Sequence, residues 1–371
     1  MLCTKRTETP PLRISRTSWY QRRWRPAPRV TRTSSAVGLS VSASSRMEQS
    51  EWVYRHEIMF LFSHGYPGWP LMRRGGRMAL GELTLERVAD IAREICARKN
   101  LEFAGHVSGG AFKRVFRVRT RDSKELALKI ICGNISQGRL AREVQALKRC
   151  SHPNICRLLE VDTFELNGTP VVFFLEEFLG GGTLSDLLAK GPIEDALFCE
   201  IGRILADTLG YLNSLSLVHR DIKPDNIMFR SDLRTPILVD FGLVRDLCAS
   251  SLTQTWQNQG PGTPYFSAPE QLNNEKNLID WRTDQFCLGL TLSFARLGLH
   301  PYQGPGGPGD HHETVTRVAM RSDRHPDFYR RARKAGLACL EKMTAPWPIG
   351  RFRSPLELTA AWQAQERERG K

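Results

Sequence analysis

The chain has 371 residues, of which 41% are hydrophobic and 25% charged, a balance typical of a globular protein. No run of about 18 apolar residues occurs, so the sequence predicts no membrane-spanning helix. The formal net charge is +14, but residues 1–47 alone carry ten Lys and Arg and one acidic residue, Glu8. The basic character therefore belongs mainly to an N-terminal arm, and a basic nucleic-acid-binding domain is not indicated.

The nine cysteines are scattered and form no CxxC pair, which argues against a metal site and against a disulfide framework. Several lie in apolar stretches, as Cys132 does after Ile131 and Cys287 after Phe286. We expect buried free thiols in a reducing compartment and a cytoplasmic location.

Residues 1–77 are expected to form a disordered basic arm, because the first 47 are rich in Arg, Ser, Thr and Pro and lack helical periodicity. Three interpretations stay open: an organelle transit peptide, an interaction tail, or an over-long gene model with true initiation at Met47 or Met78. The start of amphipathic structure just after Met78 favours the third. A secretory signal is disfavoured because no apolar region follows the basic start.

The apolar spacing then predicts a lead-in helix within residues 78–101, from Leu83 to Lys99. One further helix is expected at 140–148, and strands are expected at 103–107, 112–118, 126–131, 158–164 and 171–178. After residues 180–182, three consecutive glycines, the chain becomes mainly helical. A strand-rich first third followed by a helix-rich remainder predicts an α+β protein of two lobes with a site between them.

The segment His219–Asn226 reads HRDIKPDN. It resembles the catalytic loop of eukaryotic-type (Hanks-type) serine/threonine protein kinases, and the positions of Lys223 and Asn226 after Asp221 make the match specific. The resemblance implies the bilobal protein-kinase fold, with a small β-rich lobe and a larger helical one. It also implies transfer of the γ-phosphate of ATP to a Ser or Thr hydroxyl of a protein substrate.

In that family, Asp221 would accept the proton of the substrate hydroxyl and Lys223 would neutralise charge on the γ-phosphate. Asn226 would offer an oxygen to Mg²⁺ (or Mn²⁺). Asp240 begins an Asp-Phe-Gly segment directly after the apolar strand Ile237–Val239, and it would be the second metal ligand.

Upstream, Leu126–Lys129 resembles the kinase strand whose lysine holds the α- and β-phosphates. Strand alternation sends Ala127 and Lys129 to one face, which gives a floor for adenine and a charge for phosphate. Glu143 follows 14 residues later on the next predicted helix. We expect it to be the partner that positions Lys129.

The phosphate-binding loop departs from the family pattern G-x-G-x-x-G-x-V. From Val107 to Val115 the chain reads VSGGAFKRV, so of the three glycine positions only Gly110 is kept. Lys113 stands at the third of these positions. We expect it to point to solvent, with a charge near the phosphates as the alternative.

The hinge of the nucleotide site is a second departure. Counting back from the glycines at 180–182, the residue that gates the pocket behind adenine is either Glu176 or Leu175, and both assignments stay open. Glu177 and Leu179 would then contact ATP from the hinge. An unpaired acid at the gating position would be costly.

Downstream, residues 262–270 (GTPYFSAPE) resemble the segment that closes the activation loop. Glu270 is expected to pair with Arg351, and Asp284 to hold the backbone of the catalytic loop. Together these motifs place a kinase domain at residues 102–360, followed by a charged tail at 361–371.

Arg220, next to Asp221, suggests control by an anion. Phosphorylation, including autophosphorylation, of a residue in the following loop could dock a phosphate on Arg220. The alternative is that these are ordinary polar loop residues. The candidates are Ser250, Ser251, Thr253 and Thr255.

Two other functions compete with that of an active kinase. The eroded glycine loop prompts a pseudokinase that acts as a binding or scaffold module, although every motif residue named for catalysis is present. A small-molecule phosphotransferase is disfavoured by Lys223, Thr263 and residues 268–270 (APE). Nucleic-acid binding depends on the arm alone and is not expected.

Overall fold

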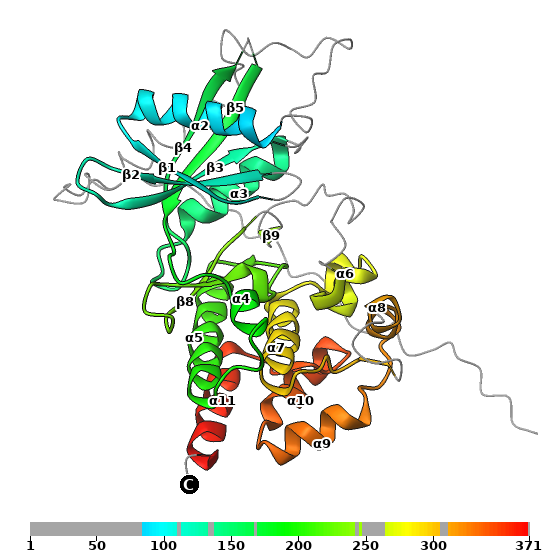
Figure 1. Cartoon of the computed structure of the whole chain (residues 1–371). Helices are drawn as coiled ribbons and strands as arrows, with labels where there is room; N and C mark the ends of the chain where they lie inside the picture. The colour runs from blue at the N-terminus through cyan, green and yellow to red at the C-terminus, as the bar shows by residue number, and fades with distance from the viewer. Residues whose placement is uncertain are drawn as a thin grey trace, which may run out of the picture. The chain divides into compact units, whose positions relative to one another are not determined.

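The computed structural model describes residues 84–109, 113–132, 137–166, 169–241, 245–246, 264–304 and 311–369. An N-terminal lobe is built on one five-stranded sheet and a C-terminal lobe is built mainly from helices (Figure 1). This confirms the predicted α+β class with two lobes. The arm at residues 1–77 lies outside the described residues. Among those described, no helix has the length and apolar character needed to cross a membrane.

The sheet of the N-terminal lobe is antiparallel, with strand order β1-β2-β3-β5-β4. The predicted strands and the helix after the third of them are all present, with bounds within three residues of those expected. The elements are β1 (Glu102–Gly109), β2 (Lys113–Arg119), β3 (Glu125–Ile131), α3 (Gln137–Arg149), β4 (Leu158–Leu166) and β5 (Thr169–Glu177).

The lead-in helix α2 (Leu85–Lys99) covers one face of this sheet (Figure 1). The Thr84 hydroxyl accepts a hydrogen bond of 3.3 Å from the Arg87 N–H and so caps the helix start. The apolar stripe of α2 shares one core with side chains from β2, β3 and β5. That core includes Val88, Ile91, Ala92, Ile95 and Cys96 from the helix, and Phe116, Val118, Leu128, Ile130, Phe173 and Leu175 from the strands.

Strand alternation then fixes what faces the opposite side of the sheet. Because Leu128 and Ile130 point into the core with α2, Ala127 and Lys129 point the other way. The register pairs Ala127 with Glu176 and Lys129 with Phe174, and directly paired residues share a face. The sheet therefore presents Lys129 and Glu176 on the same side, away from α2.

The C-terminal lobe is arranged around helix α7 (Trp281–Leu297), which is buried along almost its whole length. Helices α5 and α10 pack against α7, and α11 packs against α5 (Figure 1). The helices are α4 (Leu184–Leu188), α5 (Asp195–Ser214), α6 (Pro269–Leu272), α7, α8 (His311–Ala319), α9 (Pro326–Lys334), α10 (Ala338–Met343) and α11 (Pro355–Arg369). Short strands are β6 (Leu217–Val218), β7 (Ile227–Phe229), β8 (Pro236–Leu238) and β9 (Arg245–Asp246), and 3₁₀ turns are η2 (Pro224–Asn226), η3 (Pro264–Phe266), η4 (Lys276–Leu278) and η5 (Pro348–Gly350).

Close approach of α5 to α11 requires a glycine. A Cβ at Gly202 would lie 1.9 Å from the Trp362 ring, and Trp362 is 1% exposed. The Trp362 indole donates a 3.1 Å hydrogen bond to the Cys199 carbonyl. Gln365 accepts a 2.9 Å bond from the Cys339 N–H. The expected domain end at residue 360 therefore falls inside a packed helix, and residues 361–369 continue it instead of forming a separate tail.

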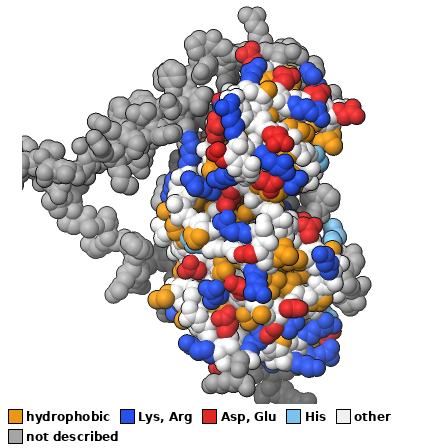
Figure 2. Space-filling model, turned by 60° about the vertical axis from the view of Figure 1, so that its left-hand side comes forward, with side chains coloured by type: hydrophobic (Ala, Val, Ile, Leu, Met, Phe, Trp, Pro, Cys, Tyr) orange, Lys and Arg blue, Asp and Glu red, His pale blue; other side chains and the backbone are white. Residues whose placement is uncertain are grey.

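The prediction of buried free thiols is confirmed for most cysteines of the described residues. Seven cysteines are free thiols, and Cys96, Cys132, Cys156, Cys287 and Cys339 are buried. On the face in Figure 2, Lys and Arg side chains are interspersed with Asp and Glu side chains over most of the described surface.

Candidate active site

A carboxylate of α7 binds the backbone of the catalytic loop. Asp284, 1% exposed, accepts hydrogen bonds of 2.7 Å from the backbone N–H groups of His219 and of Arg220. Burial raises the pKa of Asp284 to about 7, and the two N–H donors act in the opposite direction. Arg220 has φ 70°, a backbone conformation that is uncommon for a non-glycine residue. The hydrogen bond from its N–H to Asp284 helps to hold the backbone in this conformation.

A second anchor binds the same residue from α6. The Gln271 amide donates a 2.8 Å hydrogen bond to the Arg220 carbonyl, while its oxygen accepts from the Ala268 N–H at 3.1 Å and from the Cys287 thiol at 3.3 Å. Gln271 is fully buried. No sequence signal distinguishes Gln271 from a surface glutamine, because its role depends on where the fold places it.

Asp221 lies at the centre of a small polar group. Lys223 Nζ binds both of its carboxylate oxygens, at 3.1 and 3.0 Å. The Asn226 amide nitrogen donates to Asp221 Oδ2 at 2.9 Å and to its carbonyl at 2.8 Å, which leaves the Asn226 amide oxygen pointing elsewhere. Burial raises the pKa of Asp221 to about 6, against the opposing effect of Lys223. The structure thus brings together three of the predicted site residues.

His219 connects this loop to the strand that carries the second metal-ligand candidate. Its Nδ1 accepts from the Asp221 N–H at 3.2 Å, and its Nε2 lies 3.1 Å from the Val239 carbonyl. Phe241 packs edge-on against the imidazole at 4.8 Å between ring centres. Burial lowers the pKa of His219 to about 4, so the ring is neutral at physiological pH.

Asp240 follows β8 and has φ 67°. Its carboxylate forms a 2.6 Å ion pair with Lys113 Nζ from β2. Burial opposes ionisation of Asp240, but Lys113 and Lys129 outweigh it and hold its pKa below the usual range. The Lys113 side chain is 29% exposed and is bound at the site, so the expectation that it points to solvent is wrong.

Lys129 does not make its expected pair. Its ammonium contacts the carboxylate of Glu176, with side-chain exposures of 14% and 4% for the two residues. Burial opposes the charged form of Lys129, but Glu176, followed by Cys156 and Asp240, raises its pKa. Within the described residues, no ion pair joins Lys129 to Glu143. Burial, followed by the charge of Asp240, raises the pKa of Glu143 to about 7.

The strand register also settles the gating position. Glu176 shares the face of Ala127 and Lys129, whereas Leu175 points into the core with α2. The buried Glu176 carboxylate also accepts a 3.4 Å hydrogen bond from the Cys156 thiol. Of the two alternatives, Glu176 is therefore the one on the face of the sheet that carries Lys129.

The structure describes three of the remaining residues predicted to contact ATP. Val115 is paired with Lys129 across β2 and β3 and so lies on its face, and Val107 on β1 is 43% exposed. Leu179 packs with Cys156, Ile237 and Val239. Gly110 lies outside the described residues.

Glu177, the acidic residue predicted to lie in the hinge, forms hydrogen bonds with two neighbouring segments of the chain. The carboxylate of Glu177 accepts from the Arg157 N–H at 2.9 Å and from Arg230 at 2.9 Å. The Glu177 carboxylate is therefore already engaged by two groups of the protein itself.

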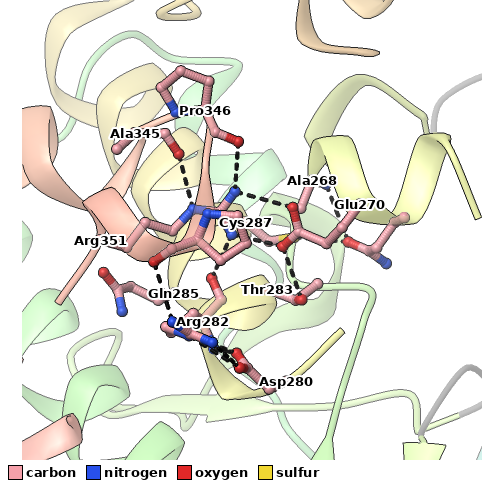
Figure 3. Close-up of polar contacts among 12 residues, drawn as sticks. Ala268, Glu270, Asp280, Arg282, Thr283, Gln285, Cys287, Ala345, Pro346 and Arg351 are labelled. Carbon is pink, nitrogen blue, oxygen red and sulfur yellow. Dashed lines mark hydrogen bonds and ion pairs between the residues drawn. The ribbon is translucent and has the colours of Figure 1, made fainter. Parts of the chain in front are cut away.

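Glu270 and Arg351 form the ion pair expected of them. Arg351 donates to the two Glu270 oxygens at 2.6 and 3.0 Å, and both side chains are 0% exposed (Figure 3). Thr283 donates to Glu270 at 2.9 Å, and Arg351 also binds the carbonyls of Ala345 and Arg282 at 2.9 and 3.0 Å. Both charges are thus compensated, which joins α6, α7 and the segment before α11.

The candidate regulatory residues Ser250, Ser251, Thr253 and Thr255 lie outside the described residues. Arg220, to which a phosphate on one of them would dock, lies between the two backbone anchors described above.

Comparison with known proteins gives one family. Residues 101–352 match the model of the protein kinase domain. Myosin light chain kinase A of Dictyostelium discoideum is 31% identical over 219 residues, which are 57% of this chain and 70% of that protein. Serine/threonine-protein kinase 1 of Arabidopsis thaliana is 28% identical over 244 residues, 64% of this chain and 27% of that protein.

A third relative is named for a broader specificity. Dual specificity testis-specific protein kinase 1 of Homo sapiens is 31% identical over 217 residues, 56% of this chain and 32% of that protein. The chain thus spans less than a third of the length of the human and Arabidopsis relatives. The matched region contains every site residue described above, and the chain belongs to the protein kinase family.

Proposed function

We propose that this chain is a serine/threonine protein kinase that transfers the γ-phosphoryl group of ATP to a hydroxyl of a protein substrate. The observation that carries the proposal is the group formed by Asp221, Lys223 and Asn226 beside Asp240. Two relatives whose names give a serine/threonine specificity or a protein substrate support the acceptor class. A third, named for dual specificity, makes tyrosine an outcome to be tested.

The donor set fits a magnesium ion. Asp240 supplies a carboxylate, and the orientation of Asn226 leaves an amide oxygen, and Mg²⁺ prefers hard oxygen ligands of this kind. Bound there with ATP, Mg²⁺ would supply charge neutralisation for the phosphates. Asp240 and Asn226 are the residues of this chain that would hold it.

The protein's own groups would then act by position and charge. Asp221 would accept the proton of the acceptor hydroxyl, and its raised pKa of about 6 leaves it largely ionised at neutral pH. Lys223, already 3.0 Å from that carboxylate, would neutralise charge on the transferred group. Lys129 would hold the α- and β-phosphates, and Ala127 would lie under the base.

A pseudokinase that acts as a binding or scaffold module is the second candidate. Two of the groups needed for nucleotide binding favour it, because Lys129 and Asp240 are each engaged by another side chain of the protein. The separating experiment is mass spectrometry of the purified protein after incubation with ATP and Mg²⁺, alone and with a generic protein substrate, beside the Asp221→Ala variant. Phosphate on Ser or Thr that depends on Asp221 supports the kinase; phosphate on Tyr would change the acceptor class, and no Asp221-dependent transfer would favour the pseudokinase.

A further inference from the structure

Two residues that depart from the protein kinase sequence pattern turn out to contact two groups of the nucleotide site. Lys113 replaces a glycine of the phosphate-binding loop and pairs with Asp240 at 2.6 Å. Glu176 is an acid at the gating position and pairs with Lys129. Each contact occupies a group that is proposed to bind the nucleotide or its metal. The two departures from the family pattern are therefore considered together.

Glu176 is held where it can compete for Lys129. It lies one strand away from Lys129 on the same face of the sheet, and its side chain is 4% exposed. A buried carboxylate without a counter-ion is strongly destabilising, so the Lys129 ammonium and the Cys156 thiol stabilise it. The contact directs the lysine toward the back of the pocket.

The same lysine has a second candidate partner. Glu143 is 7% exposed and lies within the electrostatic range of Lys129, which acts to lower its pKa. The charges of Lys113 and Lys129 both act to lower the pKa of Glu143. Two buried carboxylates thus compete for one ammonium, and the structure records the state in which Glu176 binds it.

Lys113 opposes a cation at Asp240 in a similar way. Its ammonium contacts the carboxylate that would bind the metal, and a Lys–carboxylate pair that is three-quarters buried is only weakly screened by solvent. A divalent ion at Asp240 would have to replace this contact or share it with Lys113 at the cost of charge repulsion.

We propose that Glu176 and Lys113 are built-in competitors of the nucleotide and its metal, which set the affinity of the site for both. Binding of Mg·ATP exchanges both ion pairs: Lys129 leaves Glu176 for the phosphates and Glu143, and Asp240 leaves Lys113 for the metal. This inference rests on the proposed kinase function, and it identifies two residues that determine ligand affinity without joining the transfer step.

Direct binding measurements test it independently of catalysis. Calorimetric titration with ATP and Mg²⁺ should show that Glu176→Gln binds the nucleotide about 5- to 20-fold more tightly than the wild-type chain. Titration with Mn²⁺, followed by its electron paramagnetic resonance signal, should show that Lys113→Gln lowers the half-saturating metal concentration about 3- to 10-fold.

Matched controls separate these effects from general disturbance of the pocket. Cys156→Ala removes the thiol donor of Glu176 but leaves the ion pair with Lys129, and should change ATP affinity less than about twofold. Arg117→Gln removes a cation from the same strand as Lys113 that pairs with Glu125 instead, and should leave Mn²⁺ binding unchanged.

The outcomes distinguish this inference from the proposed function. If the wild-type chain binds and transfers phosphate but Glu176→Gln binds ATP equally or more weakly, Glu176 is an anchor of Lys129 and the competitor role is overturned. An unchanged Mn²⁺ affinity in Lys113→Gln overturns the role of Lys113. If both shifts occur without phosphate transfer, the competition stands and the kinase activity fails.

A second measurement applies if a variant does not fold. In a crystal structure of the wild-type chain with ADP and Mg²⁺, the Lys129–Glu176 and Lys113–Asp240 contacts should both be broken. Retention of either contact beside bound nucleotide and metal overturns the corresponding half of the proposal.

Discussion

The Gln271 side chain donates a 2.8 Å hydrogen bond to the backbone carbonyl of Arg220, whose N–H is bound by Asp284. The residue immediately before Asp221 is therefore held from both sides in a left-handed conformation. This contact fixes the direction in which the catalytic loop leaves Arg220, and hence the orientation of the proposed base.

Replacing Gln271 by Met keeps the size of the side chain and removes its three hydrogen bonds. We expect kcat to fall about 10- to 100-fold, because a misplaced base loses alignment with the acceptor. The KM for ATP should change little, since Gln271 does not border the nucleotide pocket. Steady-state kinetics with varied ATP measure both constants, and Cys287→Ala, which removes only the 3.3 Å thiol contact, is the control. A change in KM alone would contradict the positioning role.

Asp221→Asn should reduce phosphate transfer about 10²- to 10⁴-fold, the usual contribution of a general base. The fold should be kept, because the Asn amide can still accept from Lys223. Mass spectrometry of transferred phosphate checks the rate, and circular dichroism checks the fold. Lys129→Met and Asp240→Asn should also abolish transfer; wild-type rates in either would contradict the proposed assignment of the site.

Asp221 and Lys129 show which parts of this site can be predicted from the sequence and which cannot. The resemblance of residues 219–226 to a kinase catalytic loop pointed to Asp221 and Asn226, and the structure brings these two side chains into contact. The partner of Lys129 was not predictable in this way. Glu143 has the expected sequence spacing, but the observed pairing depends on a second buried carboxylate on another strand.

Lys113 and Gln271 show the same limit. Lys113 stands at a glycine position of the family pattern, and the sequence does not reveal that its ammonium can reach Asp240. Gln271 stands beside the recognisable Glu270, yet only the packing of α6 on the catalytic loop shows its contacts. Helices α2 and α3 and the five strands of the N-terminal lobe, in contrast, follow from local periodicity, and their bounds differ from the expected ones by three residues at most.

The buried pair of Glu270 and Arg351 makes a strong stability prediction. Glu270→Gln should lower the free energy of unfolding by about 3–5 kcal/mol, because it leaves the Arg351 charge buried without a counter-ion. Urea denaturation measures the change. The exposed pair of Arg93 and Asp90 is the control, and Arg93→Met should cost no more than about 1 kcal/mol. Equal losses in the two variants would show that burial of the pair does not matter.

Helix α2 precedes the region matched by the family model, but it shares a core with the sheet. Ile91 is 0% exposed, so Ile91→Ala should cost about 2–5 kcal/mol of stability. Leu85 on the same helix is 43% exposed, and Leu85→Ala should change stability by less than about 0.5 kcal/mol. Thermal and urea unfolding compare the two. A negligible effect of Ile91→Ala would mean that α2 is not part of the folded domain.

Finally, a buried histidine far from the catalytic loop predicts how stability changes with pH. His300 Nε2 lies 3.0 Å from the Tyr265 carbonyl, and its Nδ1 accepts from the Tyr302 N–H at 3.1 Å. A proton added at Nδ1 would face that N–H, and burial lowers the pKa of His300 from 6.5 to about 3. Between these values the unfolded chain binds more protons than the folded one, so stability falls as pH falls.

His300→Gln should therefore flatten the loss of unfolding free energy between pH 6.5 and 4.5, by at most about 1.4 kcal/mol per pH unit. Urea denaturation at several pH values measures the two slopes. His219, whose pKa burial lowers to about 4, is present in both proteins and contributes equally to each curve. The difference between the curves then reports His300 alone. Parallel curves would show that its protonation is not linked to unfolding, because the imidazole would have to gain its proton equally well in the folded state.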